Sequence, residues 1–433
     1  MAPKDKNNKL PPSSRWTSLE NWDYNGMKER LESHFPALDT SVLKEHAEAV
    51  LGESMTLSTP FSAGQYWVCF ELIAADGRLV IARVRLPRHP SLLASYTAED
   101  ERYQIECEVA TMHYVRQKLP RVKIPRIYAY EPAGSPRAVA AGAAYMLIEG
   151  FYGNTLQDVE FDICQLPQST QEHIITQWTR AQADIATLTL PCIGSIAAVT
   201  PQGEPVAGRL STAKAEGLAD AGPFLTTAAY FSMVADAAVS GLALADGNNK
   251  SGLSWEALGK LVFRDIVQTT GLYSDACQRF PLFHMDMGTQ NILVDDAFNF
   301  LAVIDWEFAQ TAPWAINYYP FPFPLLHTDT EVEERLQDTE HIGHANMARQ
   351  DFSRKLYARK FREAEEALSL DAEGSFSATL DSAPSRIYAC FTRLGDDPAA
   401  DEHHVEVMVQ LAFGYGGAKA KEYLASIKQG RTD

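Results

Sequence analysis

Hydrophobic residues in the first third of the chain alternate in the manner of β-strands. The segment 66–86 contains the runs YWVCFELI and LVIARVRL, and the loop between them includes a turn-forming Asp76-Gly77 pair. This pattern predicts a β-hairpin. Two shorter apolar runs, 127–130 and 144–149, predict further strands, and glycines at positions 150 and 153 mark a break after them.

Helical periodicity prevails in the rest of the chain. The segment 98–119 places Ile105, Val109, Met112 and Val115 at spacings of three and four, which predicts a helix that ends before Pro120. The chain from residue 332 onward is expected to be mostly helical. The same reasoning predicts helices at four further places: 171–188, 226–244, 350–368 and 402–428.

The order of these elements predicts an α+β protein with two domains. A chain of 433 residues with 46% hydrophobic content is long enough to form two compact cores. We expect a strand-rich N-terminal domain over residues 15–149 and a mostly helical C-terminal domain over 150–433. Residues 1–14 are rich in Lys, Asn and Pro and lack an apolar run, which predicts a disordered tail rather than a signal peptide.

Charge and cysteine usage narrow the class of protein. The formal net charge of −18 disfavours nucleic acid and anionic membrane surfaces as partners, while a cationic substrate is compatible with it. Six widely scattered cysteines without a C-x-x-C pair are typical of reduced thiols in a cytoplasmic protein. No apolar stretch reaches membrane-spanning length, and the sequence says nothing about the oligomeric state.

Candidate chemistry is concentrated in one segment, residues 280–313, which reads FPLFHMDMGTQNILVDDAFNFLAVIDWEFAQTAP. Asp286 lies two residues after His284 and five before Asn291, which is the H-x-D-x-x-x-x-N arrangement of a phosphotransfer loop. In that arrangement the aspartate contacts the acceptor hydroxyl, the asparagine holds a metal ion, and the histidine is an internal brace. Phosphoryl transfer needs such positioning and charge neutralisation more than covalent help.

A short hairpin is predicted to complete the site. The apolar run 292–294 is followed by a turn at Asp295 and Asp296 and by a second apolar run that ends in Asp305. This length carries Asp305 back beside Asn291, and the two supply oxygen ligands that suit Mg²⁺. Glu307 is a candidate for an outer-shell or second-metal carboxylate. The alternative is a buried hydrogen-bonded turn with a strand-end cap, but the joint spacing favours the metal site.

These motifs resemble those of a known family. Phe283-His284-Met285-Asp286 with Asn291, and Ile304-Asp305-Trp306-Glu307, are similar to the catalytic-loop and metal-binding motifs of the aminoglycoside phosphotransferase and choline kinase superfamily, in particular its uncharacterised fungal-type members. The resemblance implies a bilobal protein-kinase-like fold, with an antiparallel five-stranded N-lobe carrying one helix and a mostly helical C-lobe. It also implies ATP or GTP and Mg²⁺ as cofactors, with Asp286 as the catalytic base.

The resemblance assigns further residues to the nucleotide. Arg83 stands where the family has a phosphate-binding lysine, and Glu108 or Glu106 is its expected partner. Gly64 is the one glycine of the predicted phosphate loop at 62–66. The backbone of residues 147–150 is expected to meet the adenine, which makes Ile148 and Glu149 candidate binding residues.

The predicted function is transfer of the γ-phosphate of ATP to a hydroxyl group of a small molecule. Two alternatives stay open: activation of a carboxylate through an acyl phosphate, and a non-catalytic binding protein, which the arginine at position 83 and the single-glycine loop motivate. The sequence does not identify the acceptor. His403 and His404 are adjacent and point to different faces of a helix, which predicts surface histidines rather than a shared metal site.

Overall fold

The computed structural model describes residues 10–14, 27–90, 92–219, 221–245, 253–274, 278–320, 323, 326–369 and 376–429. The described chain forms two compact units. The described residues within Met1–Phe161, Ala197–Pro205 and Thr289–Glu307 form the first unit, and those within Asp162–Ile196, Val206–Gly288 and Phe308–Asp433 form the second. The predicted α+β class is confirmed, while the predicted boundary at residue 150 stays a prediction.

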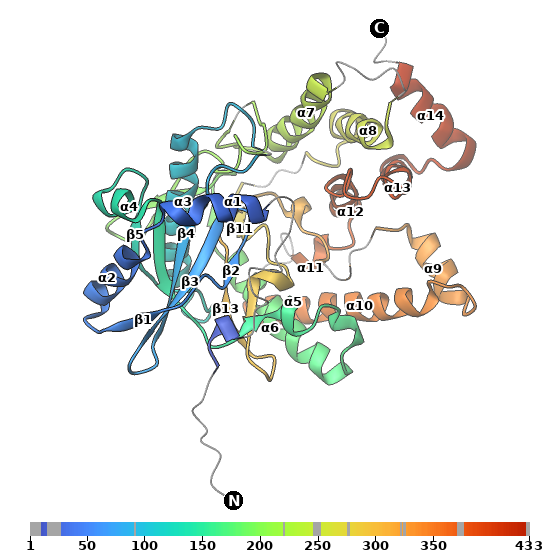
Figure 1. The fold of residues 1–433 in the computed structure, drawn as a ribbon. Helices are drawn as coiled ribbons and strands as arrows, with labels where there is room; N and C mark the ends of the chain where they lie inside the picture. The colour runs from blue at the N-terminus through green and yellow to red at the C-terminus, as the bar shows by residue number, and fades with distance from the viewer. Residues whose placement is uncertain are drawn as a thin grey trace, which may run out of the picture. The chain divides into compact units, whose positions relative to one another are not determined.

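An antiparallel sheet with the strand order β1-β3-β4-β6-β5 dominates the first unit (Figure 1). The predicted hairpin is confirmed as its centre. We expected five strands, but the described sheet has six. The additional strand is β2, which pairs with β3 outside the main strand order. The strands are β1 (Met55–Leu57), β2 (Ser62–Ala63), β3 (Trp67–Ala74), β4 (Leu79–Arg85), β5 (Ile127–Glu131) and β6 (Tyr145–Glu149).

The expectation of a single helix in this unit was also wrong. The predicted helix is confirmed as α3 and begins with a capping box between Thr97 and Asp100. Further helices occur because the second face of the sheet is apolar as well and needs a cover. The helices of the unit are α1 (Met27–His34), α2 (Thr40–Leu51), α3 (Ala98–Lys118), α4 (Pro136–Ala141) and α5 (Leu156–Val159).

Alternation along β4 gives the sheet two different faces. Val80, Ala82 and Val84 are fully buried in a core that includes Leu43 and Ala47 of α2. The intervening side chains belong to the opposite face, where Trp67, Met146 and Ile148 pack with Ile105 of α3. Arg83 and Arg85 therefore lie on the side of the sheet that α3 covers, although arginine is rarely buried in a sheet.

Two helix-ending glycines in this unit offer a matched stability test. Gly142 ends α4 with φ +85°, and a Cβ there would lie 2.1 Å from the carbonyl oxygen of Ala37. Gly52 ends α2 with φ +72° and has open space around it. We expect Gly52→Ala to lower the free energy of unfolding by about 1–2 kcal/mol and Gly142→Ala to lower it by roughly 1–3 kcal/mol more. Denaturant unfolding of both variants measures the difference, and equal losses would contradict the close packing at Gly142.

The second unit is mostly helical. The buried ring of Trp178 on α6 contacts Tyr357 on α10 and Phe323, with centroid separations of 6.1 and 6.4 Å. A small antiparallel sheet, β14-β11-β8, holds β11 in its centre. The elements are α6 (Gln168–Ala186), β8 (Thr189–Leu190), α7 (Thr227–Ala245), α8 (Trp255–Thr269), β11 (Phe280–Phe283), β14 (Gln310–Thr311), α9 (Asp329–Gln337), α10 (His344–Ala367), α11 (Phe376–Thr379), α12 (Ala383–Phe391), α13 (Asp401–Phe413) and α14 (Gly417–Gln429).

Two features of this unit differ from expectation. The helix predicted over 402–428 is two helices, α13 and α14, because Gly414 adopts a left-handed conformation with φ +67° and ends the first of them. Helix α8 was not predicted, although its apolar positions recur at helical spacing and Ser254 caps it.

Three further features complete the fold. Residues 1–9 of the predicted tail lie outside the described chain, and Pro12–Ser14 forms a short 3-10 helix whose Ser13 amide donates to Glu71. Cys69, Cys164, Cys192 and Cys390 have free thiols. None of the described helices is apolar over a length that would cross a bilayer.

The remaining strands are β7 (Asn154–Thr155), β9 (Ile196–Val199), β10 (Pro205–Ala207), β12 (Ile292–Val294) and β13 (Phe300–Val303).

Candidate active site

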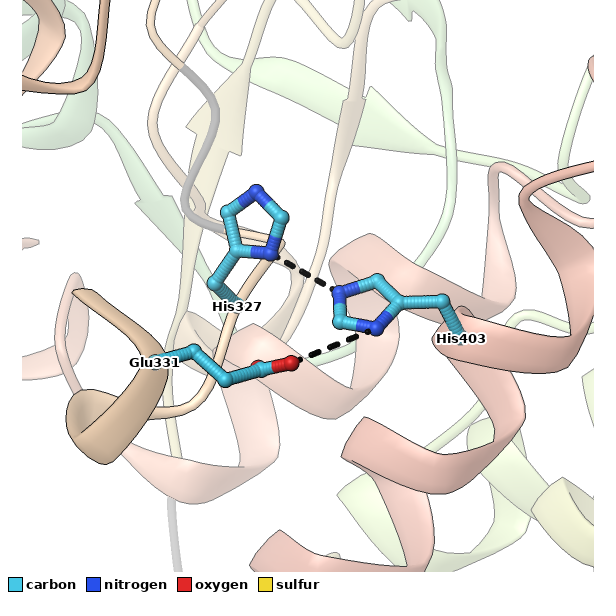
Figure 2. A group of neighbouring side chains, drawn as sticks. All are labelled: His327, Glu331 and His403. Carbon is cyan, nitrogen blue, oxygen red and sulfur yellow. Dashed lines mark hydrogen bonds and ion pairs between the residues drawn. The ribbon is translucent and has the colours of Figure 1, made fainter. Parts of the chain in front are cut away.

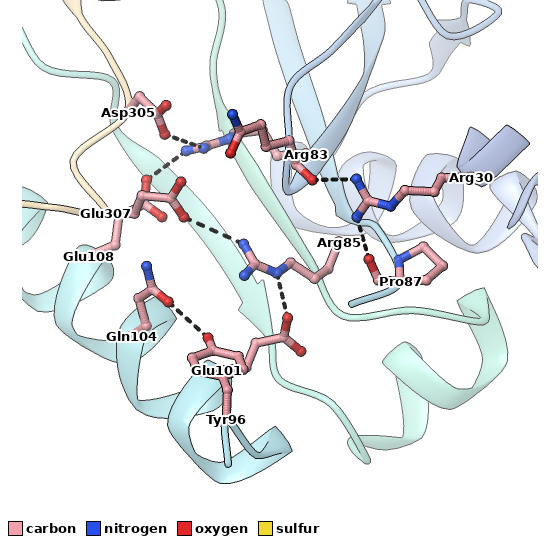
Figure 3. Close-up of polar contacts among 11 residues, drawn as sticks. Arg30, Arg83, Arg85, Pro87, Tyr96, Glu101, Gln104, Glu108, Asp305 and Glu307 are labelled. Atoms are coloured by element: carbon pink, nitrogen blue, oxygen red, sulfur yellow. Dashed lines mark hydrogen bonds and ion pairs between the residues drawn. The ribbon is translucent and has the colours of Figure 1, made fainter. Parts of the chain in front are cut away.

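Two arginines of β4 form ion pairs with two glutamates of α3 (Figure 3). Arg83 Nη1 lies 2.6 Å from Glu108 Oε1, and Arg85 Nε lies 2.9 Å from Glu101 Oε1. The arginines share a face because they are two residues apart on a strand, and the glutamates because they are seven apart on a helix. The expected pairing of Arg83 with Glu108 is therefore present. Glu106 is instead half-exposed and contacts Arg102.

The same arginines also contact two carboxylates that follow β13. Arg83 Nη2 lies 2.9 Å from Asp305 Oδ1, and Arg85 Nη1 lies 3.5 Å from Glu307 Oε2. Arg83 thus joins the strand, the helix and the end of the β12-β13 hairpin within the first unit. We call this group the ionic cluster; its members are Arg83, Arg85, Glu101, Glu108, Asp305 and Glu307.

The β12-β13 hairpin places Asp305 beside Asn291, as predicted. Ile292 pairs with Val303, and the amide of Ile304 donates to the carbonyl oxygen of Asn291 over 2.9 Å. The following residue is Asp305, whose φ of +66° is uncommon for a residue other than glycine and typical of functional positions. The indole of Trp306 is fully buried and donates to the carbonyl of Val303, which anchors the motif.

The turn of this hairpin has the structural role that the sequence predicted for Asp295. Its carboxylate accepts hydrogen bonds from the amides of Ala297 and Asn299 and from the Asn299 side chain. Lys123 also holds the hairpin, since its amino group donates to the carbonyl of Phe300. These contacts within the protein hold the turn and the second strand of the hairpin in place.

The ionic cluster is largely shielded from water. Arg83 is 8% exposed, and its guanidinium lies 4.7 Å from the centre of the Trp67 ring. Burial by itself lowers the pKa of Arg83, but the carboxylates of Glu108 and Asp305 outweigh it and raise that pKa, so Arg83 stays charged. Burial, helped by the charge of Asp305, raises the pKa of Glu307 to about 8.

The predicted catalytic loop begins in the second unit. Strand β11 is fully buried between β8 and β14, and Phe283 packs against Trp314 and Phe376. His284 follows the strand and is 3% exposed, as suits a brace. Met285 has φ +66°, and the side chain of Asp286 after it is half-buried. Asn291, in contrast, belongs to the first unit.

The remaining predicted binding residues lie in the first unit. Gly64 is exposed in the tight turn between β2 and β3, where its amide donates to the carbonyl of Trp67. Ile148 is buried in β6, an inner strand of the sheet. The amides of Glu149 and Gly150 donate to the carbonyls of Arg126 and Leu79, so both donors are used within the protein.

Sequence reasoning missed the ion pair between Arg85 and Glu101. Arg85 was visible only as another arginine of the strand, and Glu101 was not singled out. The available signal was the combination of two spacings: the arginines are two positions apart on the strand, and Glu101 and Glu108 are seven positions apart on the helix. Together they match one face of a strand to one face of a helix.

Comparison with known proteins places this site in a family. The model of a phosphotransferase enzyme family matches residues 70–318, whereas no curated protein matches the chain. Solved structures that resemble it include a macrolide 2′-phosphotransferase type I (14% identity, 86% of this chain and 97% of that chain, TM-score 0.42). Others are a macrolide 2′-phosphotransferase from Brachybacterium faecium (14%, 89% and 97%, 0.41) and a glucosamine kinase (13%, 91% and 81%, 0.40).

These structural likenesses are too remote to support an argument, so the assignment depends on the family match. The matched segment covers more than half of the chain and contains the ionic cluster together with the predicted catalytic loop. The predicted membership is confirmed, while the fungal-type branch stays a prediction. The chain belongs to the phosphotransferase enzyme family.

Proposed function

We propose that this protein is a small-molecule kinase that moves the γ-phosphate of ATP or GTP to a hydroxyl group of its substrate. One observation carries the proposal: Arg83 is held at once by Glu108 and by Asp305, and Asp305 follows the residue that is hydrogen-bonded to Asn291. This arrangement within one unit supports a phosphate-binding role for Arg83 and a metal-binding role for Asp305 and Asn291. We further propose residues 15–149 as the nucleotide-binding lobe and a cytoplasmic location.

The chemistry of these residues fits Mg²⁺ and a nucleotide. Asp305 and Asn291 offer carboxylate and amide oxygens, which Mg²⁺ prefers, and Mg²⁺ takes few protein ligands when phosphates supply the others. Two buried polar atoms of the cluster, Oε2 of Glu108 and Nη2 of Arg85, have no hydrogen-bond partner within the described chain. Such atoms favour a polar ligand, because an unsatisfied buried group costs free energy.

In the proposed reaction the protein mainly positions charges. The guanidinium of Arg83 would hold phosphate oxygens, and the carboxylate of Asp286 would orient the substrate hydroxyl and accept its proton. His284 would brace the loop that carries Asp286. A bound metal–nucleotide complex supplies the transferred phosphoryl group and neutralises charge that develops on it.

The base of the nucleotide would lie along residues 147–150, near Ile148 and Glu149, and its phosphates near the turn at Gly64. Since the amides of Glu149 and Gly150 donate within the sheet, base recognition would use other groups of this segment. The acceptor is a small molecule whose identity the site does not define.

Ligand-induced thermal stabilisation tests the nucleotide site. We expect ATP with Mg²⁺ to stabilise the purified protein by about 2.7 kcal/mol at a concentration roughly 100 times Kd, seen as a rise in Tm of several degrees. Asp305→Ala should abolish the rise, because it removes a metal ligand and a partner of Arg83. GTP is compared in parallel, and a chelator shows how much of the effect needs the metal.

The matched control is Asp296→Ala, since Asp296 is exposed at the turn of the same hairpin. This variant should respond to ATP and Mg²⁺ as the wild type does. If no nucleotide changes Tm, the kinase proposal fails and the non-catalytic binding protein becomes the better reading. If ADP appears together with an ester or amide product, the activated group is a carboxylate rather than a hydroxyl.

A further inference from the structure

Three side chains with metal-binding atoms converge in the second unit, outside the ionic cluster and the predicted catalytic loop (Figure 2). His327 precedes α9, Glu331 lies in the first turn of α9, and His403 lies in the first turn of α13. One ligand atom from each lies within 4.8 Å of the other two. His327 Nδ1 is 2.8 Å from His403 Nε2, and His403 Nδ1 is 3.5 Å from Glu331 Oε1.

Neighbouring groups hold two of these residues in place. Thr328 and Glu331 form a capping box, in which Glu331 Oε2 accepts from the amide and the hydroxyl of Thr328. The other oxygen, Oε1, is the one that lies nearer His403. Arg386 donates to the backbone carbonyl of His327 and contacts Asp329, which fixes the chain that leads into α9. Supporting contacts of this kind orient metal ligands.

A hydrogen bond joins His327 to His403, and His403 Nδ1 lies 3.5 Å from Glu331 Oε1. Arg335 Nη1 lies 3.2 Å from His327 Nε2, and because arginine only donates, that nitrogen must be the acceptor. The proton of His327 is then on Nδ1 and points to His403 Nε2. In that tautomer His403 Nε2 is an acceptor, so the carbonyl of Leu326, 3.1 Å away, receives no hydrogen bond from it. Because its Nε2 accepts from Arg335, the imidazole of His327 is neutral, which is the form that binds metals.

We propose that His327, Glu331 and His403 form a binding site for a zinc-type divalent cation. Two imidazoles and one carboxylate are a ligand set that Zn²⁺ accepts, with a fourth position left for water. Tetrahedral bonds of about 2.0–2.1 Å place ligand atoms roughly 3.3 Å apart. The three candidate ligand atoms lie within 4.8 Å of one another, so the group must contract to bind the ion. His403 and Glu331 are 29% and 33% exposed, which gives a cation access from solvent.

Arg335 opposes the cation in two ways. Its positive charge repels a second cation, and its N–H group occupies His327 Nε2, which must carry the proton once Nδ1 binds metal. A glutamine at position 335 removes the charge, and its amide oxygen can accept a hydrogen bond from the Nε2–H group of His327. The variant Arg335→Gln should therefore bind Zn²⁺ more tightly than the wild type does.

Occupancy of this site would join α13 to the segment that leads into α9. Helix α9 also lines a cavity of about 360 Å³ with α10, through Asp329, Val332 and Glu333 on one side and Asp351 and Arg354 on the other. Cation binding would thus fix one wall of that cavity. This inference is independent of the proposed kinase activity, because none of its residues belongs to the ionic cluster or the catalytic loop.

Calorimetric titration of Zn²⁺ into the chelator-treated full-length protein tests the site. We expect one bound ion per chain, an affinity at least tenfold lower in His327→Ala and in His403→Ala, and roughly tenfold higher affinity in Arg335→Gln. The matched control is His341→Ala, because His341 is an exposed histidine of the same unit and should leave binding unchanged. Co²⁺ should give the visible absorption of a tetrahedral complex in the wild type and lose it in His403→Ala.

Melting curves without metal show whether each variant is folded. If both histidine variants unfold, Arg335→Gln still decides, because unchanged or weaker Zn²⁺ binding in that variant contradicts the proposal. Equal Zn²⁺ binding by the wild type and a folded His327→Ala/His403→Ala double variant would also overturn it, since the ion would then be held by other surface groups.

Discussion

Replacement of Asp286 by asparagine should lower the turnover of ATP by about 10²- to 10⁴-fold. Asparagine keeps the size of the side chain but cannot accept a proton from the attacking hydroxyl. Slow hydrolysis of ATP, in which water is the acceptor, provides an assay before the substrate is identified. The Mg²⁺-dependent rise in Tm with ATP should persist in this variant, because the ionic cluster and Asn291 are unaltered.

Two controls separate a chemical defect from a structural one. Asp338→Asn changes an exposed aspartate of the same unit and should turn over ATP at the wild-type rate. The melting temperature of Asp286→Asn without ligand shows whether the loop after β11 is intact. Unchanged turnover in a folded Asp286→Asn variant would rule out Asp286 as the residue that orients the acceptor.

Removal of the Arg83 side chain should produce the largest loss of stability among single replacements in the ionic cluster. Glu108 is 1% exposed, and its ion-pair partner in the described chain is Arg83. Arg83→Met leaves that carboxylate buried without a counter-charge, which costs about 3–5 kcal/mol in comparable cases. Asp305 contributes less to the loss, because its side chain is 30% exposed and can be hydrated. Denaturant unfolding measures the effect.

A second replacement identifies the cause. Arg83→Met/Glu108→Leu removes both charges, and we expect it to recover most of the lost stability, because a buried ion pair is often replaceable by apolar groups. Arg102→Met is the matched control on α3, since its contact with Glu106 is half-exposed and contributes less than about 1 kcal/mol. A double variant as unstable as Arg83→Met would point to lost packing on Trp67 instead.

Local patterns were sufficient for much of the fold. Strand alternation over 66–86 and the stripe from Ile105 to Val115 gave β3, β4 and α3 close to their observed bounds. Helix α8 was missed although its periodicity was visible, whereas two other errors arose at features of one or two residues. Gly414 is a single left-handed position inside a long helical pattern, and Ser62–Ala63 is too short to show alternation. Such features depend on backbone conformation and on the neighbouring strand rather than on periodicity.

In the candidate site, too, contacts between residues close in sequence were predictable, and contacts between distant residues were not. Asn291 and Asp305 are close in sequence, so the hairpin length alone predicted their proximity. The contact of Arg83 with Asp305 spans 222 positions and depends on packing that no local pattern contains. His404 was expected at the surface but is 6% exposed, because it lies on the inner side of α13. His403 approaches His327 across 76 positions, which helix geometry alone could not indicate.

The composition of the ionic cluster has a consequence for the order in which ligands arrive. Two guanidinium groups face four carboxylates, so the cluster carries more acidic than basic groups. Burial raises the pKa values of Glu307 and Glu108, which reduces that surplus of negative charge. A bare polyphosphate is repelled by such a field, whereas a dication or a dication already paired with the polyphosphate is attracted. Productive encounters should therefore begin with the metal-complexed nucleotide, and excess free nucleotide should compete poorly with it.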